Sequence, residues 1–224
     1  MISVVIPVLD EAAAIAGTLE GLRAQEGRYE AIVVDGGSDD ETVAIAGRYA
    51  RVIDSPKGRA RQMNAGAMEA SGDVLLFLHA DTQLPPGAMA AIEDALADPR
   101  VVGGRFKVRL NHPGWAYRVV GHSINLRDRL IGGFTGDQAI FVRAGVFRDL
   151  GGYGDMPLME DLDFGRRMRR AGKVARLPLT VVTSARRWQK NGVVRTILLM
   201  WLLRSLYLMG IAPSRLKRLY GETR

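Results

Sequence analysis

The sequence predicts an α/β fold in which a mostly parallel sheet is flanked by helices on both faces. Short apolar runs rich in β-branched residues alternate with helical patterns of about ten to fifteen residues, which is typical of βαβ units. Runs such as VVIPV and VLLFL are apolar at every position, as expected for strands buried on both faces. The 224 residues include no cysteine, which excludes disulfides, thiolate-bound zinc, iron–sulfur clusters and a cysteine nucleophile.

The individual elements follow this alternation along the chain. Residues 11–25 carry Ile15, Leu19 and Leu22 at helical spacing. Before them, the β-branched run Ile2–Val8 predicts a buried strand rather than a signal peptide. The predicted strands are 2–8, 31–34, 51–53, 74–78, 101–110 and 139–142, and the predicted helices are 11–25, 41–49, 59–70, 86–96 and 112–130.

The net charge of +7 is concentrated at the end of the chain. Residues 186–224 contain nine Lys and Arg and one acid, a net of +8, whereas residues 1–185 contain 22 basic and 23 acidic residues. Nucleic-acid binding ordinarily spreads basic side chains over the folded surface, so we expect no nucleic-acid partner. A basic tail on a neutral body indicates contact with an anionic membrane or with a phosphate-bearing partner.

Acidic residues follow three of the predicted strands at the point where each strand ends. Asp10 and Glu11 come after the first strand, Asp35 after the second and Asp81 after the fourth. In open parallel sheets, ligands bind outside the carboxyl ends of the strands. We therefore expect a polar ligand site at this edge of the sheet.

Asp35 begins the segment DGGSDDET, which has two interpretations. Gly36 and Gly37 can form a turn, and the acids after them can complement the dipole of the next helix. A carboxylate directly after an apolar strand can also accept a hydrogen bond from a base N–H or a ribose hydroxyl, and we favour this interpretation. The chain has neither G-x-x-x-x-G-K nor G-x-G-x-x-G, so it carries no P-loop and no dinucleotide fingerprint.

His79 and Asp81 point to the same side of the strand end in the segment FLHADT. A carboxylate at such a position suits Mg²⁺ or Mn²⁺, because the phosphate oxygens of a substrate supply the remaining ligands. The alternative is that Asp81 caps the turn before Pro85. His79 has two open roles, since imidazole tolerates Mn²⁺ and can equally hydrogen-bond to a substrate.

Glu160 and Asp161 begin a predicted helix whose later turns carry arginines. Acids at the start and bases at the end complement the helix dipole, which by itself explains much of the pattern. A carboxylate beside another acid can also have its pKa raised, which suits a general base. Glycine-rich loops lie at 132–136 and 151–154, and we expect them to be mobile and to close over the ligands.

Five segments follow one another along the chain: VVIPVLDEA, VVDGGSDDET, FLHADT, GDQAIFVR and MEDLDFGRR. Together they resemble the family 2 glycosyltransferases of the GT-A fold, from residue 2 to about residue 188. The resemblance implies a GT-A domain at 1–188, of which 1–100 binds the nucleotide sugar and 101–188 holds the acceptor and catalytic groups. It further implies a UDP- or GDP-linked sugar donor, an acceptor hydroxyl and an inverting transfer.

The resemblance also implies roles by position. Asp81 matches the last aspartate of the family's D-x-D motif, which holds Mg²⁺ or Mn²⁺. Asp161 matches the catalytic base, with Glu160 as its acidic neighbour, and the GDQ segment is similar to an acceptor-side loop with Asp137 and Gln138. The residues matched to the nucleoside pocket are Pro7, Asp10, Glu11 and Asp35.

Some positions depart from the family pattern or leave it open. His79 stands where the D-x-D motif has its first acid, and we keep it as a donor contact. Family members often have an arginine that contacts phosphate or base near 59–61, and we favour Arg61 over Arg59. Arg186 and Arg187 either reach the diphosphate or simply begin the basic tail.

Two other classes of protein compete with this interpretation. A nucleotidyltransferase acting on a sugar phosphate shares the α/β build and the metal carboxylate. It usually carries a glycine-rich basic loop after its first strand, where this chain has LDEAA. A non-enzymatic basic adaptor for membrane or nucleic acid would have a basic body rather than a neutral one, so the glycosyltransferase is favoured.

Residues 189–224 form a predicted basic, amphipathic helical appendage. The single charge of residues 196–214 is Arg204, which costs roughly 2.5–3.5 kcal/mol on membrane-insertion scales, so we expect no spanning helix. We expect a helix that lies on the cytoplasmic membrane face and presents the site to a lipid-linked acceptor. The alternative is that its apolar stripe packs on the catalytic domain or on a second subunit in a homodimer. The stripe comprises Leu198, Leu199, Leu202, Leu203, Leu206 and Met209.

Overall fold

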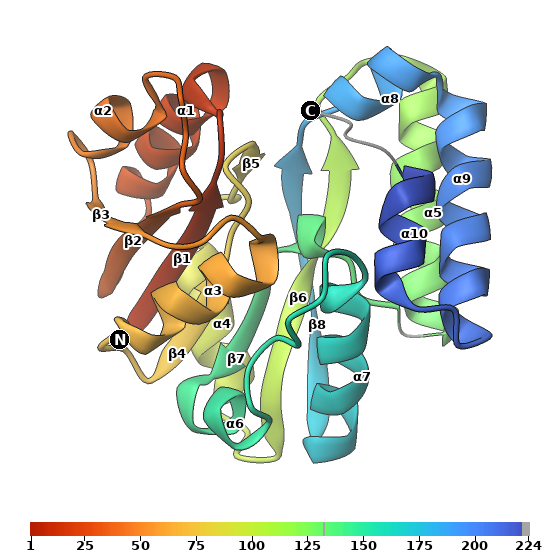
Figure 1. The fold of residues 1–224 in the computed structure, drawn as a ribbon. Coiled ribbons are helices and arrows are strands. Elements are labelled where there is room, and N and C mark those ends of the chain that lie inside the picture. The colour runs from red at the N-terminus through yellow and green to blue at the C-terminus, as the bar shows by residue number, and fades with distance from the viewer. Residues whose placement is uncertain (132, 221–224) are drawn as a thin grey trace.

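The computed structural model describes residues 1–131 and 133–220, which fold around one mixed sheet of eight strands (Figure 1). Helices cover both faces of the sheet, as the alternating pattern predicts, and the strand order is β3-β2-β1-β4-β7-β6-β8-β5. The strands are β1 Ile2–Val8, β2 Tyr29–Asp35, β3 Arg51–Asp54, β4 Val74–Phe77, β5 Thr82–Gln83, β6 Val101–Leu110, β7 Ile140–Arg143 and β8 Lys173–Thr183. The helices are α1 Ala12–Arg23, α2 Thr42–Ala46, α3 Arg59–Met68, α4 Ala88–Leu96, α5 Trp115–Ile131, the 3₁₀ turn η1 Gly136–Gln138, α6 Ala144–Asp149, α7 Glu160–Ala171, α8 Arg186–Asn191, α9 Val193–Leu208 and α10 Pro213–Tyr220.

The first half of the sheet is parallel. β1 pairs in parallel with β2 and with β4, and β2 pairs in parallel with β3. Every residue of β1 is buried, as its uninterrupted apolar run predicts. The predicted elements of residues 2–96 are confirmed, with shifts of a few residues at their ends. Val8 lies opposite Asp35 in the register, so the ends of β1 and β2 meet.

Two apolar clusters fix the sheet between its helices. On one face, α1 and α4 contribute Leu19 and Ile92, and on the other face α3, α6 and α7 contribute Met63, Phe147 and Phe164. Burial of each such side chain stabilises the fold by about 1.5–3 kcal/mol. This packing on both faces holds the strands in place, and with them the polar residues at the strand ends.

The second half of the sheet is mixed. β7 runs antiparallel to both β4 and β6, whereas β6 and β8 are parallel. The sequence pattern misses β5, α6 and β8. β8 is hard to recognise because Arg176 and Pro178 interrupt its apolar residues, and β5 has only two residues. Thr82 pairs with Thr183, which brings β5 and the preceding Asp81 beside the end of β8.

The described part of the tail forms three helices on one flank of the molecule (Figure 1). The prediction of one helix over 196–214 is wrong, because Gly210 has a left-handed φ of 91° and Pro213 begins a new helix. α9 contacts α5, α8 and α10, and Leu203 and Leu216 are buried, so part of the predicted stripe packs on the chain itself. No helix within the described residues has the length and apolar character needed to cross a membrane.

Candidate active site

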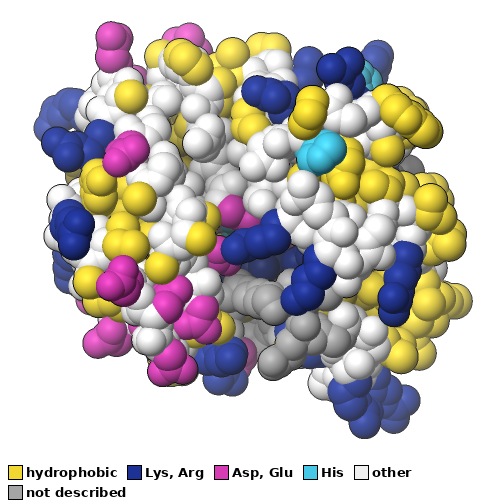
Figure 2. Space-filling model, turned by 90° about the horizontal axis from the view of Figure 1, so that it is seen from above, with side chains coloured by type: hydrophobic (Ala, Val, Ile, Leu, Met, Phe, Trp, Pro, Cys, Tyr) yellow, Lys and Arg dark blue, Asp and Glu magenta, His cyan; other side chains and the backbone are white. Residues whose placement is uncertain are grey.

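The carboxyl ends of β1, β2 and β4 meet at one edge of the sheet, where Asp10, Glu11, Asp35 and Asp81 lie. In a view onto this edge, acidic side chains lie in a central hollow with Lys and Arg side chains beside them (Figure 2). Pro7, which the sequence matches to the nucleoside pocket, is buried within β1 just below this edge. The hollow therefore collects charged groups of both signs at the end of a buried sheet.

Asp35 is bonded within its own turn. Its Oδ2 accepts hydrogen bonds from the backbone N–H groups of Gly37 and Ser38, each at 2.9 Å, and its Oδ1 accepts one from the Ser38 hydroxyl at 2.5 Å. Asp10 joins the same loop, because its N–H donates to Ser38 Oγ and its Oδ1 accepts the N–H of Asp39. These contacts confirm the turn, whereas a donor contact by Asp35 stays a prediction.

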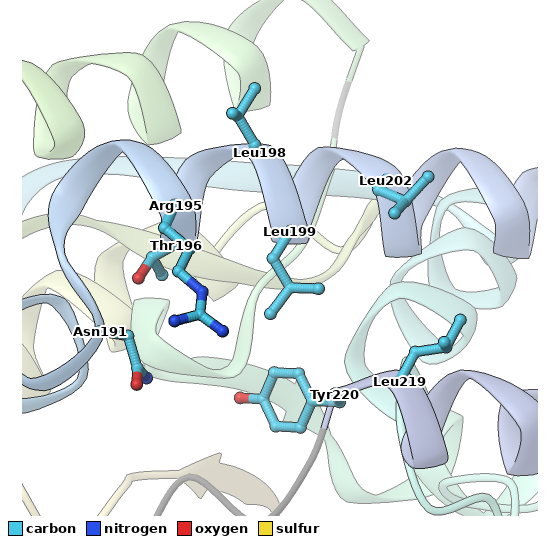
Figure 3. A pocket seen from close by; sticks show the side chains of 8 residues that line it. All are labelled: Asn191, Arg195, Thr196, Leu198, Leu199, Leu202, Leu219 and Tyr220. Atoms are coloured by element: carbon cyan, nitrogen blue, oxygen red, sulfur yellow. The ribbon is translucent and has the colours of Figure 1, made fainter.

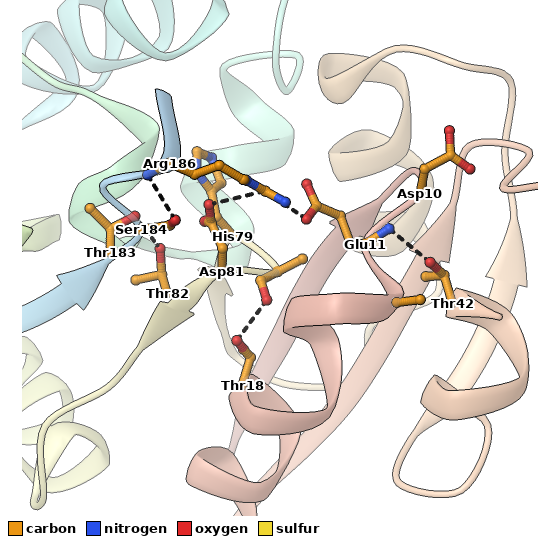
Figure 4. Close-up of polar contacts among 12 residues, drawn as sticks. Asp10, Glu11, Thr18, Thr42, His79, Asp81, Thr82, Thr183, Ser184 and Arg186 are labelled. Carbon is orange, nitrogen blue, oxygen red and sulfur yellow. Dashed lines mark hydrogen bonds and ion pairs between the residues drawn. The ribbon is translucent and has the colours of Figure 1, made fainter. Parts of the chain in front are cut away.

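Glu11, Asp81 and Arg186 form an ion-pair cluster across the hollow (Figure 4). Arg186 Nη2 lies 2.8 Å from Glu11 Oε2 and 3.5 Å from Asp81 Oδ2. Arg186 therefore reaches from α8 into the predicted donor half, as a diphosphate contact requires. The guanidinium carbon of Arg187 lies 5.0 Å from the ring centroid of Tyr220, and the positive charge of Arg187 also lowers the pKa of Asp137.

The donor set around Asp81 fits a divalent cation that is shared with a substrate. Mg²⁺ bound together with nucleotide phosphates needs only one or two protein carboxylates. The Asp81 side chain is 24% exposed and opens onto the hollow, and its Oδ2 already faces the cation of Arg186. The described residues contain no group of three metal-ligating side chains, so phosphate oxygens would have to supply the other ligands.

Asp161, at the start of α7, is held by two backbone N–H groups. Gly136 donates to its Oδ2 and Leu162 donates to its Oδ1, each at 2.7 Å. Burial and the neighbouring charge of Glu160 raise the pKa of Asp161 from 3.8 to about 6, although the N–H groups and Arg59 act in the opposite direction. A carboxylate with this pKa is ionised at neutral pH and yet binds a proton well, which is the combination a general base requires.

Arg59, at the start of α3, belongs to this acidic cluster. Its Nη1 lies 3.4 Å from Oε1 of Glu160, a residue that is 4% exposed. Burial opposes the charge of Arg59, but the surrounding carboxylates, chiefly Glu160, raise its pKa above the ordinary value. Arg61, which the sequence favours, points elsewhere and forms a bidentate pair with Asp155 at 2.9 Å. Residues two apart in a helix do not lie on the same face, so the sequence indicates that Arg59 and Arg61 cannot both point toward the acidic cluster.

His79 faces Asp137 on the η1 turn. Its Nδ1 lies 3.0 Å from Asp137 Oδ1, and its Nε2 is buried without a hydrogen-bond partner among the described residues. The ring packs against Gly136, where a Cβ would collide with the imidazole. Although burial raises the pKa of Asp137, the hydrogen bond from His79 holds it well below its ordinary value.

Gln138 links the η1 turn to β6 by hydrogen bonds. It is fully buried, its Oε1 accepts the N–H of Thr135 at 3.1 Å, and its Nε2 donates to the carbonyl of Phe106 at 3.4 Å. The side chain of Gln138 is thus buried and bonded within the chain, and the acceptor-side role expected from sequence stays a prediction. Of the two loops expected to be mobile, residue 132 lies outside the described residues, and the motion of 133–136 and 151–154 stays a prediction.

Comparison with known proteins places the chain in a family. Residues 3–149 match the glycosyl transferase family 2. The chain is 33% identical over 181 residues to a PGL/p-HBAD biosynthesis glycosyltransferase of Mycobacterium bovis, an alignment that covers 75% of this chain and 69% of that protein. An uncharacterized glycosyltransferase of Mycobacterium tuberculosis, Rv1514c, is 33% identical over 174 residues, which cover 73% of this chain and 64% of the relative.

Solved structures share the fold at low sequence identity. The mannosyltransferase PcManGT from Pyrobaculum calidifontis, in complex with GDP-Man and Mn²⁺, aligns with a TM-score of 0.66 at 19% identity over 95% of this chain and 66% of that chain. Residues 1–349 of S. aureus TarS, in complex with UDP-GlcNAc, align with a TM-score of 0.62 at 17% identity over 82% of this chain and 58% of theirs.

The chain therefore belongs to glycosyl transferase family 2 and has the GT-A-like mixed α/β fold of these neighbours. It is an enzyme that transfers glycosyl groups.

Proposed function

We propose that the enzyme transfers a sugar from a UDP- or GDP-linked donor to an acceptor hydroxyl, with inversion at the anomeric carbon and Asp161 as the general base. The observation that carries this proposal is Asp161 itself, a carboxylate held by two N–H groups whose pKa is raised to about 6 by burial and by Glu160. Two structural neighbours bind UDP-GlcNAc and GDP-Man, which supports a nucleotide-sugar donor.

The donor is proposed to bind in the hollow at the ends of β1, β2 and β4. Its diphosphate would lie near Arg186, whose guanidinium already spans Glu11 and Asp81 across the hollow. The contacts proposed from sequence for the rest of the donor are Pro7, Asp10, Glu11, Asp35, Arg61, His79 and Arg187. Of these, Arg61 and Arg187 have the weakest support, because they pair with Asp155 and Tyr220.

Asp81 would hold Mg²⁺ or Mn²⁺ together with the phosphate oxygens of the donor. When bound, such an ion supplies positive charge to a leaving diphosphate. Arg186 lies 3.5 Å from the same carboxylate and would supply further positive charge on that side of the sugar.

Asp161 would act on the opposite side of the sugar from the diphosphate. It takes the proton of the acceptor hydroxyl as that oxygen forms a bond to the anomeric carbon. The bond from that carbon to the diphosphate oxygen breaks, and its electron pair leaves with the diphosphate. Arg59 lies 3.4 Å from Glu160 and fixes its position. The negative charge of Glu160 raises the pKa of Asp161, so we assign Glu160 the role of a positioning residue.

A donor screen tests the proposed reaction. The enzyme is incubated with UDP- and GDP-linked sugars, Mn²⁺ and a panel of acceptors, and the released nucleoside diphosphate is measured. We expect release of UDP or GDP, and a product whose anomeric configuration by NMR is opposite to that of the donor. Release of inorganic pyrophosphate would instead indicate a nucleotidyltransferase, and a product with retained configuration would contradict inversion.

The α5–α9 flank supports docking of this enzyme on an anionic membrane near a lipid-linked acceptor. Hydrophobic side chains gather on this flank (Figure 2), and those exposed by half or more are Trp115, Val119, Leu126 and Leu130 on α5 and Val194, Leu198, Trp201, Leu202 and Leu208 on α9. A cavity of about 480 Å³ separates α9 from α10, and Leu199 points toward Tyr220 across it while Leu198 points away (Figure 3). α8, α9 and α10 carry basic residues and no acid, which complements anionic lipids.

Flotation with liposomes tests this docking. We expect the enzyme to float with phosphatidylglycerol vesicles, to float poorly with phosphatidylcholine vesicles, and to lose binding in Trp201→Ser with Leu202→Ser. A salt-resistant dimer that stays at the bottom of both gradients would show that the flank is a subunit interface.

A further inference from the structure

Two arginines that the reaction scheme does not use lie under the α5–α9 flank. Nε and Nη2 of Arg127, on α5, and Nε of Arg204, on α9, are buried and have no hydrogen-bond partner among the described residues. Buried polar groups in native proteins are nearly always bonded, so each exception calls for an explanation such as a bound ion. Because the three unpaired N–H groups belong to two neighbouring cations, a single bound anion could accept hydrogen bonds from all of them.

The nearby carboxylates are already engaged. Oδ1 of Asp128, the residue after Arg127, accepts from Nε of Arg105 at 2.7 Å, and its Oδ2 lies 3.6 Å from Nε of Arg176. Asp161 uses both of its oxygens for backbone N–H groups. Among the described residues, no ion pair joins a carboxylate to either guanidinium, although the charges of Asp128 and Asp161 act on both from a greater distance.

The electrostatics of the pair are unfavourable without an anion. Burial and the charge of Arg127 lower the pKa of Arg204 to about 10, and burial likewise lowers the pKa of Arg127. Arg127 and Arg204 are half-buried, and two such cations that repel one another are more stable when a counter-charge lies between or beside them. A negatively charged ligand bound between or beside the two arginines would supply this counter-charge.

The pair lies next to the proposed base. The guanidinium of Arg204 rests against Gly133, where a Cβ would collide with it, and the same loop continues to Gly136, whose N–H binds Asp161. The charge of Asp161 acts on both Arg127 and Arg204. α5 and α9 lie on the opposite flank of the molecule from β1 and β2, where the donor half is (Figure 1).

We propose that Arg127 and Arg204 form an anion subsite that binds a phosphate group carried by the acceptor, beside Asp161. Guanidinium groups present paired N–H donors that match phosphate oxygens, and two positive charges balance a phosphate monoester of about −2. The acceptor assignment rests on the proposed function. The other source of phosphate is the donor diphosphate, which under the proposed function lies near Arg186 and Asp81.

Binding of inorganic phosphate by calorimetry tests the subsite in the full chain. Wild type is compared with Arg127→Gln, with Arg204→Gln and with Arg195→Gln, which changes an exposed arginine on the same helix as Arg204. We expect the first two substitutions to weaken phosphate at least tenfold and the control to bind as wild type does. Since the first two also remove a half-buried cation with unpaired N–H groups, we expect their melting temperatures without phosphate to equal or exceed that of wild type. If either variant fails to fold, Arg204→Lys, which keeps the charge but loses the fork, should fold and bind phosphate more weakly.

The same titration with saturating UDP, and then with GDP, distinguishes the two sources of phosphate. Phosphate that still binds alongside the nucleotide supports the acceptor subsite. Phosphate that the nucleotide displaces, or equal affinity in wild type and all variants, would overturn the proposal. Because this measurement needs neither donor nor turnover, its outcome is separate from that of the donor screen.

Discussion

The two sides of the hollow differ in how their charged groups are bonded. On the proposed donor side, Asp35 is bonded within its own loop and Glu11 pairs with Arg186. On the other side, Asp161 has a raised pKa, and Arg127 and Arg204 bury N–H groups that no described residue accepts. The proposed donor side is thus bonded within the chain, whereas the other side keeps a carboxylate with a raised pKa and N–H groups without a partner among the described residues.

This difference separates structural from chemical roles among similar residues. The carboxylate of Asp35 is fixed in place by hydrogen bonds within its own turn. Asp161 is also fixed by two N–H groups, but burial and Glu160 make its ionised form less favourable. The acid suited to proton transfer is therefore the one that the fold positions without fully stabilising its charge.

Replacing the proposed base should cause the largest loss of turnover among the substitutions proposed here. Asp161→Asn keeps the size of the side chain but removes the proton acceptor, so we expect turnover to fall roughly 100-fold or more with donor affinity nearly unchanged. Asp163→Asn is the matched control, because Asp163 lies on the same helix and pairs with Arg167. Near-normal transfer by Asp161→Asn, measured as released nucleoside diphosphate, would reduce Asp161 to a helix-capping acid.

Removing Arg59 should change the pH dependence of turnover more than its maximum. Arg59 is one of the groups that lower the pKa of Asp161, so Arg59→Gln should move the ascending limb of the pH profile upward by about one unit. At pH 6 this corresponds to a several-fold loss of turnover, and at pH 8 to little loss. A profile unchanged in position would show that Arg59 does not act on the base.

The raised pKa of Asp161 also predicts a stability effect. Because its pKa in the folded chain, about 6, exceeds the ordinary 3.8, the stability linked to its protonation is present below pH 4 and is lost as the pH rises through 6. Asp161→Asn should therefore melt higher than wild type at pH 7.5, by about 2–4 °C for each kcal/mol of penalty removed. At pH 3.5, where Asp161 is protonated in both states, it should melt at the same temperature as wild type. A gain of equal size at both pH values would contradict the linkage.

The smallest effect is expected on the exposed surface. The pair of Arg61 with Asp155 is largely in solvent, and such pairs contribute about 0.2–1 kcal/mol. Arg61→Gln should therefore leave turnover and its pH profile within twofold of wild type. A large loss of donor affinity by calorimetry would restore Arg61 to the donor site that the sequence favours for it.

The fold was largely accessible from sequence because its signals are local. The strands of the first half are uninterrupted apolar runs, and the acids at their ends lie where a parallel sheet places them. The pattern does not predict β8, because Arg176 and Pro178 interrupt its apolar residues. It predicts one helix in the tail, because the apolar residues on both sides of Gly210 and Pro213 have helical spacing.

The candidate site was only partly accessible, because its geometry depends on residues that are distant in the chain. Asp161 could be named from its motif, but its contact with Gly136 and its raised pKa come from tertiary packing. The Arg59–Glu160 pair joins residues 101 positions apart. The same holds for Arg127 and Arg204, since neither helix alone shows that some of their N–H groups are buried without a partner among the described residues.

The pH dependence of kcat in the wild-type enzyme, measured with saturating donor and acceptor from pH 4.5 to 8, tests the role of Asp161 most directly. With a base whose pKa is about 6, kcat should rise about tenfold per pH unit in the acid range and level off above pH 6 to 7. A kcat that is constant across this range would contradict Asp161 as the general base.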